Sequence, residues 1–269
     1  MGFLIIFLIV LAIVGIYLLL IMPRVFDRAD MDLLLFDYAH RGLWNDIYPE
    51  NSLGAFARAV EAGVGIELDI QLSKDKKIVV FHDYDLKRMC GINKKVSELT
   101  FEELQKIKLK GTTQSIPTLA DVLKLVDGKV PLLIELKGEE KNIELCKRTA
   151  TMLDKYHGAF CVESFNPLLL SWFKNFRPRY ARGQLVTNKI KKTKKGSSLF
   201  AFSMSNLFLN CISRPDFIAV DGRMRKRPAI YICNKIFKAK IFVWTVRTKR
   251  EYEISQKEGF HAIFEKFLP

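Results

Sequence analysis

Apolar residues and carboxylates alternate along the run from Gly65 to Ile70, which reads Gly-Ile-Glu-Leu-Asp-Ile. Side chains two residues apart share one face of a β-strand, so Glu67 and Asp69 lie on one face and the branched residues on the other. The two carboxylates are then about 6.5 Å apart along the strand. Carboxylates this close are protonated, solvated or held by a cation, and a hard divalent ion suits them. An edge strand with its polar face in water is the alternative.

Downstream of residue 32, short apolar runs with the character of strands alternate with segments of helical periodicity. Strands are predicted at 33–36, 64–70, 78–81, 130–136, 159–163, 182–186, 217–220, 241–246 and 261–264. Helices are predicted at 53–62, 139–156, from 167 onward, and at 199–212, 230–237 and 249–258. Two capping boxes, Thr100 with Glu103 and Thr118 with Asp121, predict helix starts within the long segment 84–128.

This alternation predicts an α/β fold, a (β/α)8 TIM barrel over residues 33–269, because such barrels need roughly 250 residues. A doubly wound open sheet is the alternative. In a barrel the chemistry gathers at the carboxyl ends of the strands. The candidates at or near these ends are His40, Arg41, Glu67, Asp69, His82, Glu135, Lys137, Glu163 and Trp244.

Loops are polar in general, but the mixture of residue types at these strand ends is specific. Acids, two histidines, an arginine and a lysine together provide a metal site, an acid/base pair and two anion-binding groups. Such a set suits a phosphate ester as substrate.

The first residues differ in kind from the rest of the chain. Residues 3–22 carry no charge and are almost wholly apolar, which is long enough to cross a bilayer as a helix. The basic n-region and small-residue cleavage site of a signal peptide are not evident. We therefore predict a single-pass membrane anchor at residues 1–23 and a linker at 24–32. Arg24 and Arg28 follow the apolar run, so the positive-inside rule places the catalytic domain in the cytoplasm.

A formal net charge of +14 raises the question of nucleic acid. The sequence has no zinc-finger, helix-turn-helix or RNA-binding signature, and an anchored basic domain is drawn instead to an anionic membrane surface. No nucleic-acid partner is expected. The five cysteines are an odd number without metal-type spacing, which indicates reduced core thiols and agrees with a cytoplasmic location.

Seven short motifs occur in a fixed order along the chain. They are His40-Arg41-Gly42, Pro49-Glu50-Asn51-Ser52, Gly65-Ile66-Glu67-Leu68-Asp69-Ile70, His82-Asp83, Ile116-Pro117-Thr118-Leu119, Glu135-Leu136-Lys137 and Ser164-Phe165-Asn166-Pro167. In this order and spacing, the chain from about Phe36 to its C-terminus resembles the glycerophosphodiester phosphodiesterase family.

The resemblance implies a role for each matching residue. The metal ligands would be Glu67, Asp69 and Glu135, holding one divalent cation, Mg²⁺ or Ca²⁺. The acid/base pair would be His40 and His82, and the phosphate contacts would be Arg41 and Lys137. Trp244 would pack on the glycerol moiety, with a core tryptophan as the alternative. Glu163 would bind substrate, with metal coordination or a merely polar strand end as alternatives. Residues 84–113 would form a small insertion beside the barrel mouth.

The reaction implied is metal-dependent hydrolysis of glycerophosphodiesters to glycerol 3-phosphate and an alcohol through a cyclic phosphate. Two alternatives keep the fold: a lysophospholipase D acting on membrane lysolipids, and a catalytically silent lipid-binding barrel. The chain departs from the family pattern at Arg247, where Asn is frequent, and at Phe264-Glu265, where Thr-Asp is frequent. We expect these departures to affect leaving-group specificity.

Two basic clusters follow strands and should ring the barrel mouth. One contains Lys189, Lys191, Lys192, Lys194 and Lys195, and the other Arg223, Arg225, Lys226 and Arg227. The apolar segment around Leu199 to Leu209 lies between them. Either this face rests against an anionic bilayer, or the charges are solvated and the segment is core.

Overall fold

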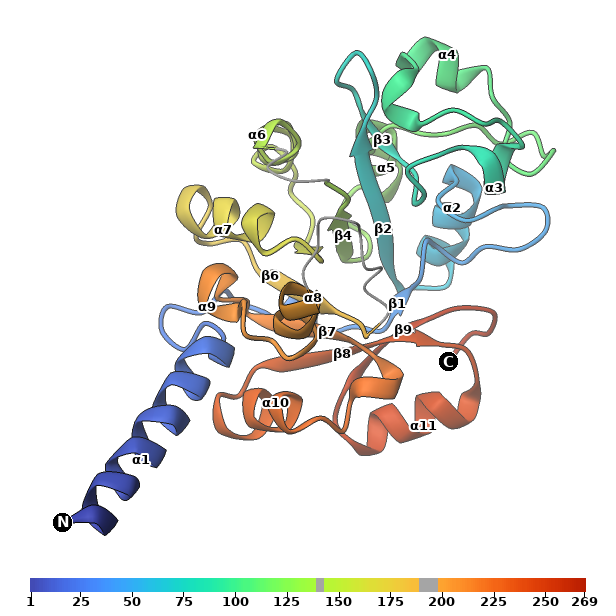
Figure 1. The fold of residues 1–269 in the computed structure, drawn as a ribbon. Coiled ribbons are helices and arrows are strands. Elements are labelled where there is room, and N and C mark those ends of the chain that lie inside the picture. The colour runs from blue at the N-terminus through green and yellow to red at the C-terminus, as the bar shows by residue number, and fades with distance from the viewer. Residues whose placement is uncertain (139–142, 189–197) are drawn as a thin grey trace.

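The computed structural model describes residues 1–138, 143–188 and 198–269. Within them, eight parallel strands close into a barrel, because β1 (Tyr38–Ala39) pairs with both β2 (Gly65–Leu72) and β9 (His261–Phe264). Between β2 and β9 lie β4 (Leu132–Leu136), β5 (Phe160–Ser164), β6 (Arg182–Val186), β7 (Phe217–Asp221) and β8 (Lys240–Val246). The predicted TIM barrel is confirmed, and closure through β1 excludes the open sheet (Figure 1).

Helices surround the barrel and join successive strands (Figure 1). They are α2 (Leu53–Glu61), α5 (Leu119–Val126), α6 (Ile143–Leu153), α7 (Pro167–Phe176), α8 (Ser198–Ser205), α9 (Asn210–Ser213), α10 (Pro228–Tyr231), the π-helix η4 (Ile232–Ile236) and α11 (Lys249–Lys257). Their starts follow local chemistry: the Ser52 side chain accepts from the N–H of Ala55 at the start of α2. Both predicted capping boxes are present, at α5 and at α4 (Phe101–Gln105).

The alternating pattern of β2 separates two apolar cores. The branched residues Ile66, Leu68 and Ile70 are fully buried against the layer of outer helices. Inside the barrel, a smaller cluster that includes Tyr38, Phe217 and Phe242 fills the lower end. Because this aromatic layer closes the floor, the polar side chains of the strands gather above it, at the mouth.

Between β2 and α5 the chain forms a separate lobe (Figure 1). It begins with β3 (Ile78–Val80), which pairs antiparallel with β2, and continues through α3 (Lys87–Cys90), the 3-10 turn η2 (Val96–Glu98) and α4. A third apolar cluster, which includes Met89, Val96 and Leu104, gives the lobe a core of its own. The lobe lies beside β2, on the opposite side of the barrel from the N-terminal helix α1 (Gly2–Ile21).

Three predicted elements differ in the structure. The predicted strand 33–36 is wrong: Asp32–Leu34 form a 3-10 turn, η1, and Leu34 packs under Tyr38, whose hydroxyl donates to the Leu34 carbonyl at 2.9 Å. The predicted helix 199–212 is two helices, because Leu207 adopts a left-handed φ of 64°. The helix predicted at 230–237 begins earlier, at Pro228 in its first turn, where the missing N–H costs nothing.

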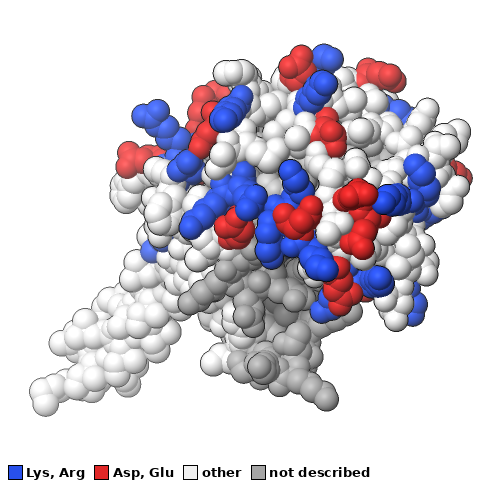
Figure 2. Space-filling model, turned by 90° about the horizontal axis from the view of Figure 1, so that it is seen from above, with Lys and Arg blue, Asp and Glu red and all other residues white. Residues whose placement is uncertain are grey.

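Helix α1 projects from the barrel (Figure 1). It has 20 residues, a mean hydropathy of 3.4, and only 6% of its apolar window buried, so by length and composition it can cross a membrane. In Figure 2 the projecting helix carries no charged side chain, whereas Lys, Arg, Asp and Glu cover much of the body.

Candidate active site

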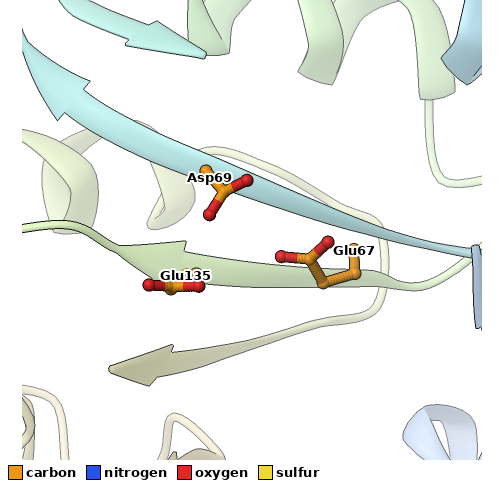
Figure 3. A group of neighbouring side chains, drawn as sticks. All are labelled: Glu67, Asp69 and Glu135. Carbon is orange, nitrogen blue, oxygen red and sulfur yellow. The ribbon is translucent and has the colours of Figure 1, made fainter. Parts of the chain in front are cut away.

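Three carboxylates converge at the carboxyl ends of neighbouring strands. Glu67 and Asp69 come from β2 and Glu135 from β4, where the strand register sets Asp69 directly beside Glu135. One oxygen of each lies within 4.8 Å of the others, and all three residues are buried (Figure 3). Oxygen donors at this spacing fit a hard divalent cation such as Mg²⁺ or Ca²⁺.

The cluster concentrates negative charge in a buried place. Burial and the neighbouring carboxylates of Asp69 and Glu163 raise the pKa of Glu67 well above its usual range. Burial also raises the pKa of Glu135, despite the nearby Lys137. For Asp69 burial opposes ionisation, but surrounding cations, including Lys137 and Arg41, more than offset it and lower the pKa. A divalent cation would relieve this repulsion, so the donor set fits a metal.

Two cations border the carboxylates. The Lys137 ammonium lies 2.9 Å from a Glu135 oxygen and 3.4 Å from Asp69. Arg41 has a left-handed φ of 61°, and its backbone N–H donates to Glu67 at 2.8 Å. This turn also directs the Arg41 guanidinium to Glu50 at 2.7 Å. Both cations therefore lie where the phosphate oxygens of a ligand on the acid cluster would meet them.

The histidine His82 is held by a chain of charged side chains. Its Nδ1 lies 2.6 Å from Asp83, and Arg88 of α3 donates to the other Asp83 oxygen at 2.6 Å. The same guanidinium donates to both Glu50 oxygens, at 2.9 and 2.6 Å. Glu50 in turn accepts from Arg41. Arg88 thus connects the support of His82 with the support of Arg41.

The second histidine, His40, has an equivalent arrangement. Its Nδ1 lies 2.8 Å from Glu265, which follows β9, and Arg247 donates to the other Glu265 oxygen at 2.6 Å. Burial opposes ionisation of Glu265, but hydrogen bonds from His40 and Arg247 lower its pKa to about 2. An ionised carboxylate only accepts, so Nδ1 of His40 carries the proton and Nε2 is left for a ligand.

A cavity of about 160 Å³ lies between the two histidines. Its lining is His40, Arg41, Glu67, His82, Glu135, Glu163, Phe165, Leu185, Trp244 and Ile263. The Trp244 indole donates to the Ala219 carbonyl at 3.0 Å, and Phe165 packs against the same ring edge to face at 5.7 Å. This fixes an aromatic wall on one side of the cavity.

Glu163 is an exception among the polar residues of the cavity. Its side chain is 1% exposed, and its Oε2 atom has no hydrogen-bond partner within the described residues. Burial, together with the nearby Glu135 carboxylate, raises its pKa well above the usual range, which favours the neutral acid. A neutral carboxyl both donates and accepts, which suits a ligand hydroxyl.

Seven of the nine candidate residues line the cavity. The other two, Asp69 and Lys137, lie 3.4 Å from each other within the same cluster of charged side chains. The structure therefore brings all nine together. Sequence reasoning missed the roles of Glu50 and Arg88, although Glu50 lies in one of the motifs. It treated Glu265 and Arg247 only as departures that affect the leaving group, whereas both support His40.

The basic clusters have different outcomes. The lysine cluster 189–195 lies outside the described residues. In the arginine cluster, which follows β7, Arg223 pairs with Asp221, Arg225 with Glu258, and Arg227 donates to the Ser205 carbonyl at 3.0 Å. Each of these three arginines therefore has a partner within the described residues.

Comparisons with known proteins agree with this geometry. The model of the Glycerophosphoryl diester phosphodiesterase family matches residues 40–267. A glycerophosphodiester phosphodiesterase of Caldanaerobacter subterraneus is 31% identical over 242 residues, covering 84% of this chain and 91% of that protein. A human lysophospholipase D is 31% identical over 121 residues, covering 40% of this chain and 38% of that protein.

Solved structures share the fold. A glycerophosphodiester phosphodiesterase from Thermotoga maritima has a TM-score of 0.64 at 27% identity, covering 85% of this chain and 92% of that one. A phosphodiesterase from Oleispira antarctica, solved in complex with the product sn-glycerol-3-phosphate, has a TM-score of 0.70 at 22% identity, covering 85% and 91%.

Proposed function

Because this chain belongs to the glycerophosphodiester phosphodiesterase family, we propose that it hydrolyses glycerophosphodiesters to glycerol 3-phosphate and an alcohol, with one divalent cation and two histidines. The single observation that carries the proposal is the cavity itself. It places His40 and His82 beside three converging carboxylates, and each histidine is held through Nδ1 by a carboxylate of its own.

In this proposal Glu67, Asp69 and Glu135 hold the cation, which supplies Lewis-acid stabilisation of charge on the phosphate when it is bound. Arg41 and Lys137 contact the phosphate oxygens. Buried acids already hold the Arg41 guanidinium and the Lys137 ammonium in place, so these side chains lose little conformational freedom when substrate binds. This preorganisation favours the transition state.

The two histidines divide the proton transfers. The glycerol 2-hydroxyl attacks phosphorus, one histidine takes its proton, and the other protonates the departing alcohol oxygen. A cyclic phosphate results. Water then opens the ring with the roles of His40 and His82 reversed, which returns both to their starting protonation states. In each step Nε2 acts, since Nδ1 is bound to Glu265 or Asp83.

The glycerol moiety is proposed to lie against Trp244, with Glu163 bonded to a glycerol hydroxyl. A second candidate reaction is lysophospholipase D activity, favoured by the similarity to the human enzyme of that name over 40% of this chain. A catalytically silent lipid-binding barrel would have no need for two supported histidines beside an acid cluster.

We further propose that α1 is a single-pass anchor, that the catalytic domain lies in the cytoplasm, and that an anionic membrane surface is its partner. A signal sequence passes the same test of length and composition. The contacts at the end of α1 support an anchor: Arg214 donates to the Met22 carbonyl at 2.8 Å, which integrates the helix end into the fold.

The test is turnover by the purified full chain of glycerophosphocholine and lysophosphatidylcholine, with and without EDTA. We expect glycerophosphocholine to be the better substrate, EDTA to abolish turnover, and His40→Ala to lower kcat at least about 100-fold. His157→Ala, outside the cavity, is the matched control and should keep full activity. Undiminished turnover after exhaustive chelation would sink the proposal.

A further inference from the structure

The C-terminal end of α1 is tied to the catalytic domain. The last carbonyls of a helix have no partner within it. Here the Ile21 carbonyl accepts from the Asn210 amide at 2.8 Å and from the Cys233 thiol at 3.3 Å, and the Met22 carbonyl accepts from Arg214. Side chains from α9 and η4 therefore complete the helix end.

The segment after α1 is bonded just as closely. The N–H of Arg24 donates to the Pro215 carbonyl at 2.9 Å, and its guanidinium donates to the Pro178 carbonyl at 2.7 Å. Ala29 donates to the Asp216 carboxylate at 3.1 Å. Because α1 and the domain form one continuous hydrogen-bonded unit, the direction of α1 fixes how the domain is oriented.

Helix α8 presents apolar side chains beside this junction. Leu199 is 70% exposed, Phe202 54% and Phe200 51%, and the chain carries no charge between Lys195 and Arg214. A ladder of rings leads from α1 to this face: Tyr17 packs edge to face on Phe208 at 5.9 Å, and Phe208 on Phe202 at 5.7 Å.

We propose that the face of α8 formed by Leu199, Phe200 and Phe202 lies in the interfacial layer of the bilayer that α1 spans. This rests on the anchoring proposed above. A 20-residue helix covers about 30 Å, the thickness of the hydrocarbon core, so the C-terminal end of α1 at Ile21 lies at the interface. Tyr17 lies one turn before this end, roughly 6 Å below the interface, within the depth to which interfacial helices bury their apolar face. The ring ladder brings α8 to about the same depth.

The domain thus has two membrane contacts, one spanning and one lying in the surface. An uncharged, phenylalanine-rich face in contact with a membrane anchor matches the chemistry of acyl chains. A second copy of the chain is the competing occupant of α8, and the experiment distinguishes the two.

The test uses the full chain in nanodiscs of phosphatidylcholine and phosphatidylglycerol, with or without brominated acyl chains. The variants Phe202→Trp and Leu199→Trp each add an indole on α8, and Ile47→Trp is the control, exposed in the loop before α2. After subtraction of the wild-type signal, brominated lipid should remove about half of the added emission at the two α8 positions and none at Ile47→Trp.

Unchanged turnover of glycerophosphocholine verifies that each variant folds. If the α8 positions are quenched no more than the control, the inference is wrong, and a dimer by mass would then assign the face to a second copy. Failure of the chain to remain with vesicles after a carbonate wash would instead refute the anchor, so the two failures are distinguishable.

Discussion

At the scale of single residues, each histidine of the cavity is supported by a carboxylate that an arginine also holds. Glu265 is shared between His40 and Arg247, just as Asp83 is shared between His82 and Arg88. An arginine bonded to the second oxygen keeps the carboxylate ionised. It also weakens the attraction of the carboxylate for the histidine proton. At His40, Arg247 therefore offsets part of the rise in pKa that the hydrogen bond to Glu265 causes.

We expect opposite effects on pH dependence from the two partners of His40. Burial lowers the pKa of His40, while its hydrogen bond to Glu265 raises it. Glu265→Gln removes the carboxylate, so the pKa should fall and the acid limb of the kcat/KM profile should move to lower pH. Arg247→Asn leaves Glu265 to His40 alone, so the limb should move to higher pH.

For the same pair, kcat should fall about 10- to 100-fold in Glu265→Gln, by analogy with the outer partners of metal-binding histidines. It should fall much less in Arg247→Asn. Arg250→Asn, at an exposed position on α11, is the control and should leave the profile in place. Profiles that coincide for all three variants would show that neither Glu265 nor Arg247 acts through His40.

A second prediction concerns Glu163, whose role the sequence left open. An amide can make the same hydrogen bond to glycerol as a buried carboxyl, so Glu163→Gln should raise KM by less than about threefold. Glu163→Ala should raise KM about 10-fold or more, because a hydrogen bond to the substrate is lost. The concentration of Mg²⁺ or Ca²⁺ for half-maximal activity should not change in Glu163→Gln; weaker activation by metal would make Glu163 a ligand.

Among helices and strands, the sequence predicts best those elements in which the alternation of residue types assigns each side chain to one face. Glu67 and Asp69 alternate with branched residues, and β2 forms as expected because a slip of one residue would bury the carboxylates in the outer core. The run around Leu34 is equally apolar but forms a turn, because the barrel floor needs that side chain below Tyr38. The apolar pattern around Leu34 cannot reveal this requirement, because it arises from tertiary packing.

Contacts between elements also could not be predicted from the local sequence pattern. Arg88 and Glu50 are 38 positions apart, and Arg247 and Glu265 are 18 apart. Nothing in either local sequence indicates the pairing, which depends on the packing of the α3 lobe and on the closure of the barrel. The motif positions were predictable because their residue types and order are specific, whereas their supports are ordinary charged residues.

The lobe between β2 and α5, which contains α3, should therefore matter to catalysis through Arg88. Replacement by Gln removes the bonds to both Asp83 and Glu50, so kcat should fall about 10-fold or more. Arg88→Lys should rescue little, because a single ammonium cannot make the forked contacts. Lys87→Gln, on the same short helix, should be silent. Equal activity of the Lys and Gln variants with the wild type would show that the lobe supports folding alone.

At the scale of the whole molecule, the barrel carries a buried charge conflict that ligand binding resolves. Glu67, Asp69 and Glu135 repel one another within 4.8 Å, and their strands cannot separate without opening the sheet. Without a bound cation, this repulsion lowers the free energy of unfolding of the protein. A cation that binds only the folded state removes it and adds its own binding free energy.

This yields a prediction that does not depend on turnover. At a cation concentration about 100 times its Kd, stabilisation is about 2.7 kcal/mol, which for a chain of this size raises Tm by about 5–10 °C. Thermal unfolding of the full chain in detergent, with EDTA and then with Mg²⁺ or Ca²⁺, measures the shift. Glu135→Gln should raise the Tm of the apo protein, since it removes one repelling charge, and should reduce the shift. Glu102→Gln, an exposed acid on α4, should retain the full shift. A Tm that is indifferent to both metals in the wild type would mean that the three acids hold no cation.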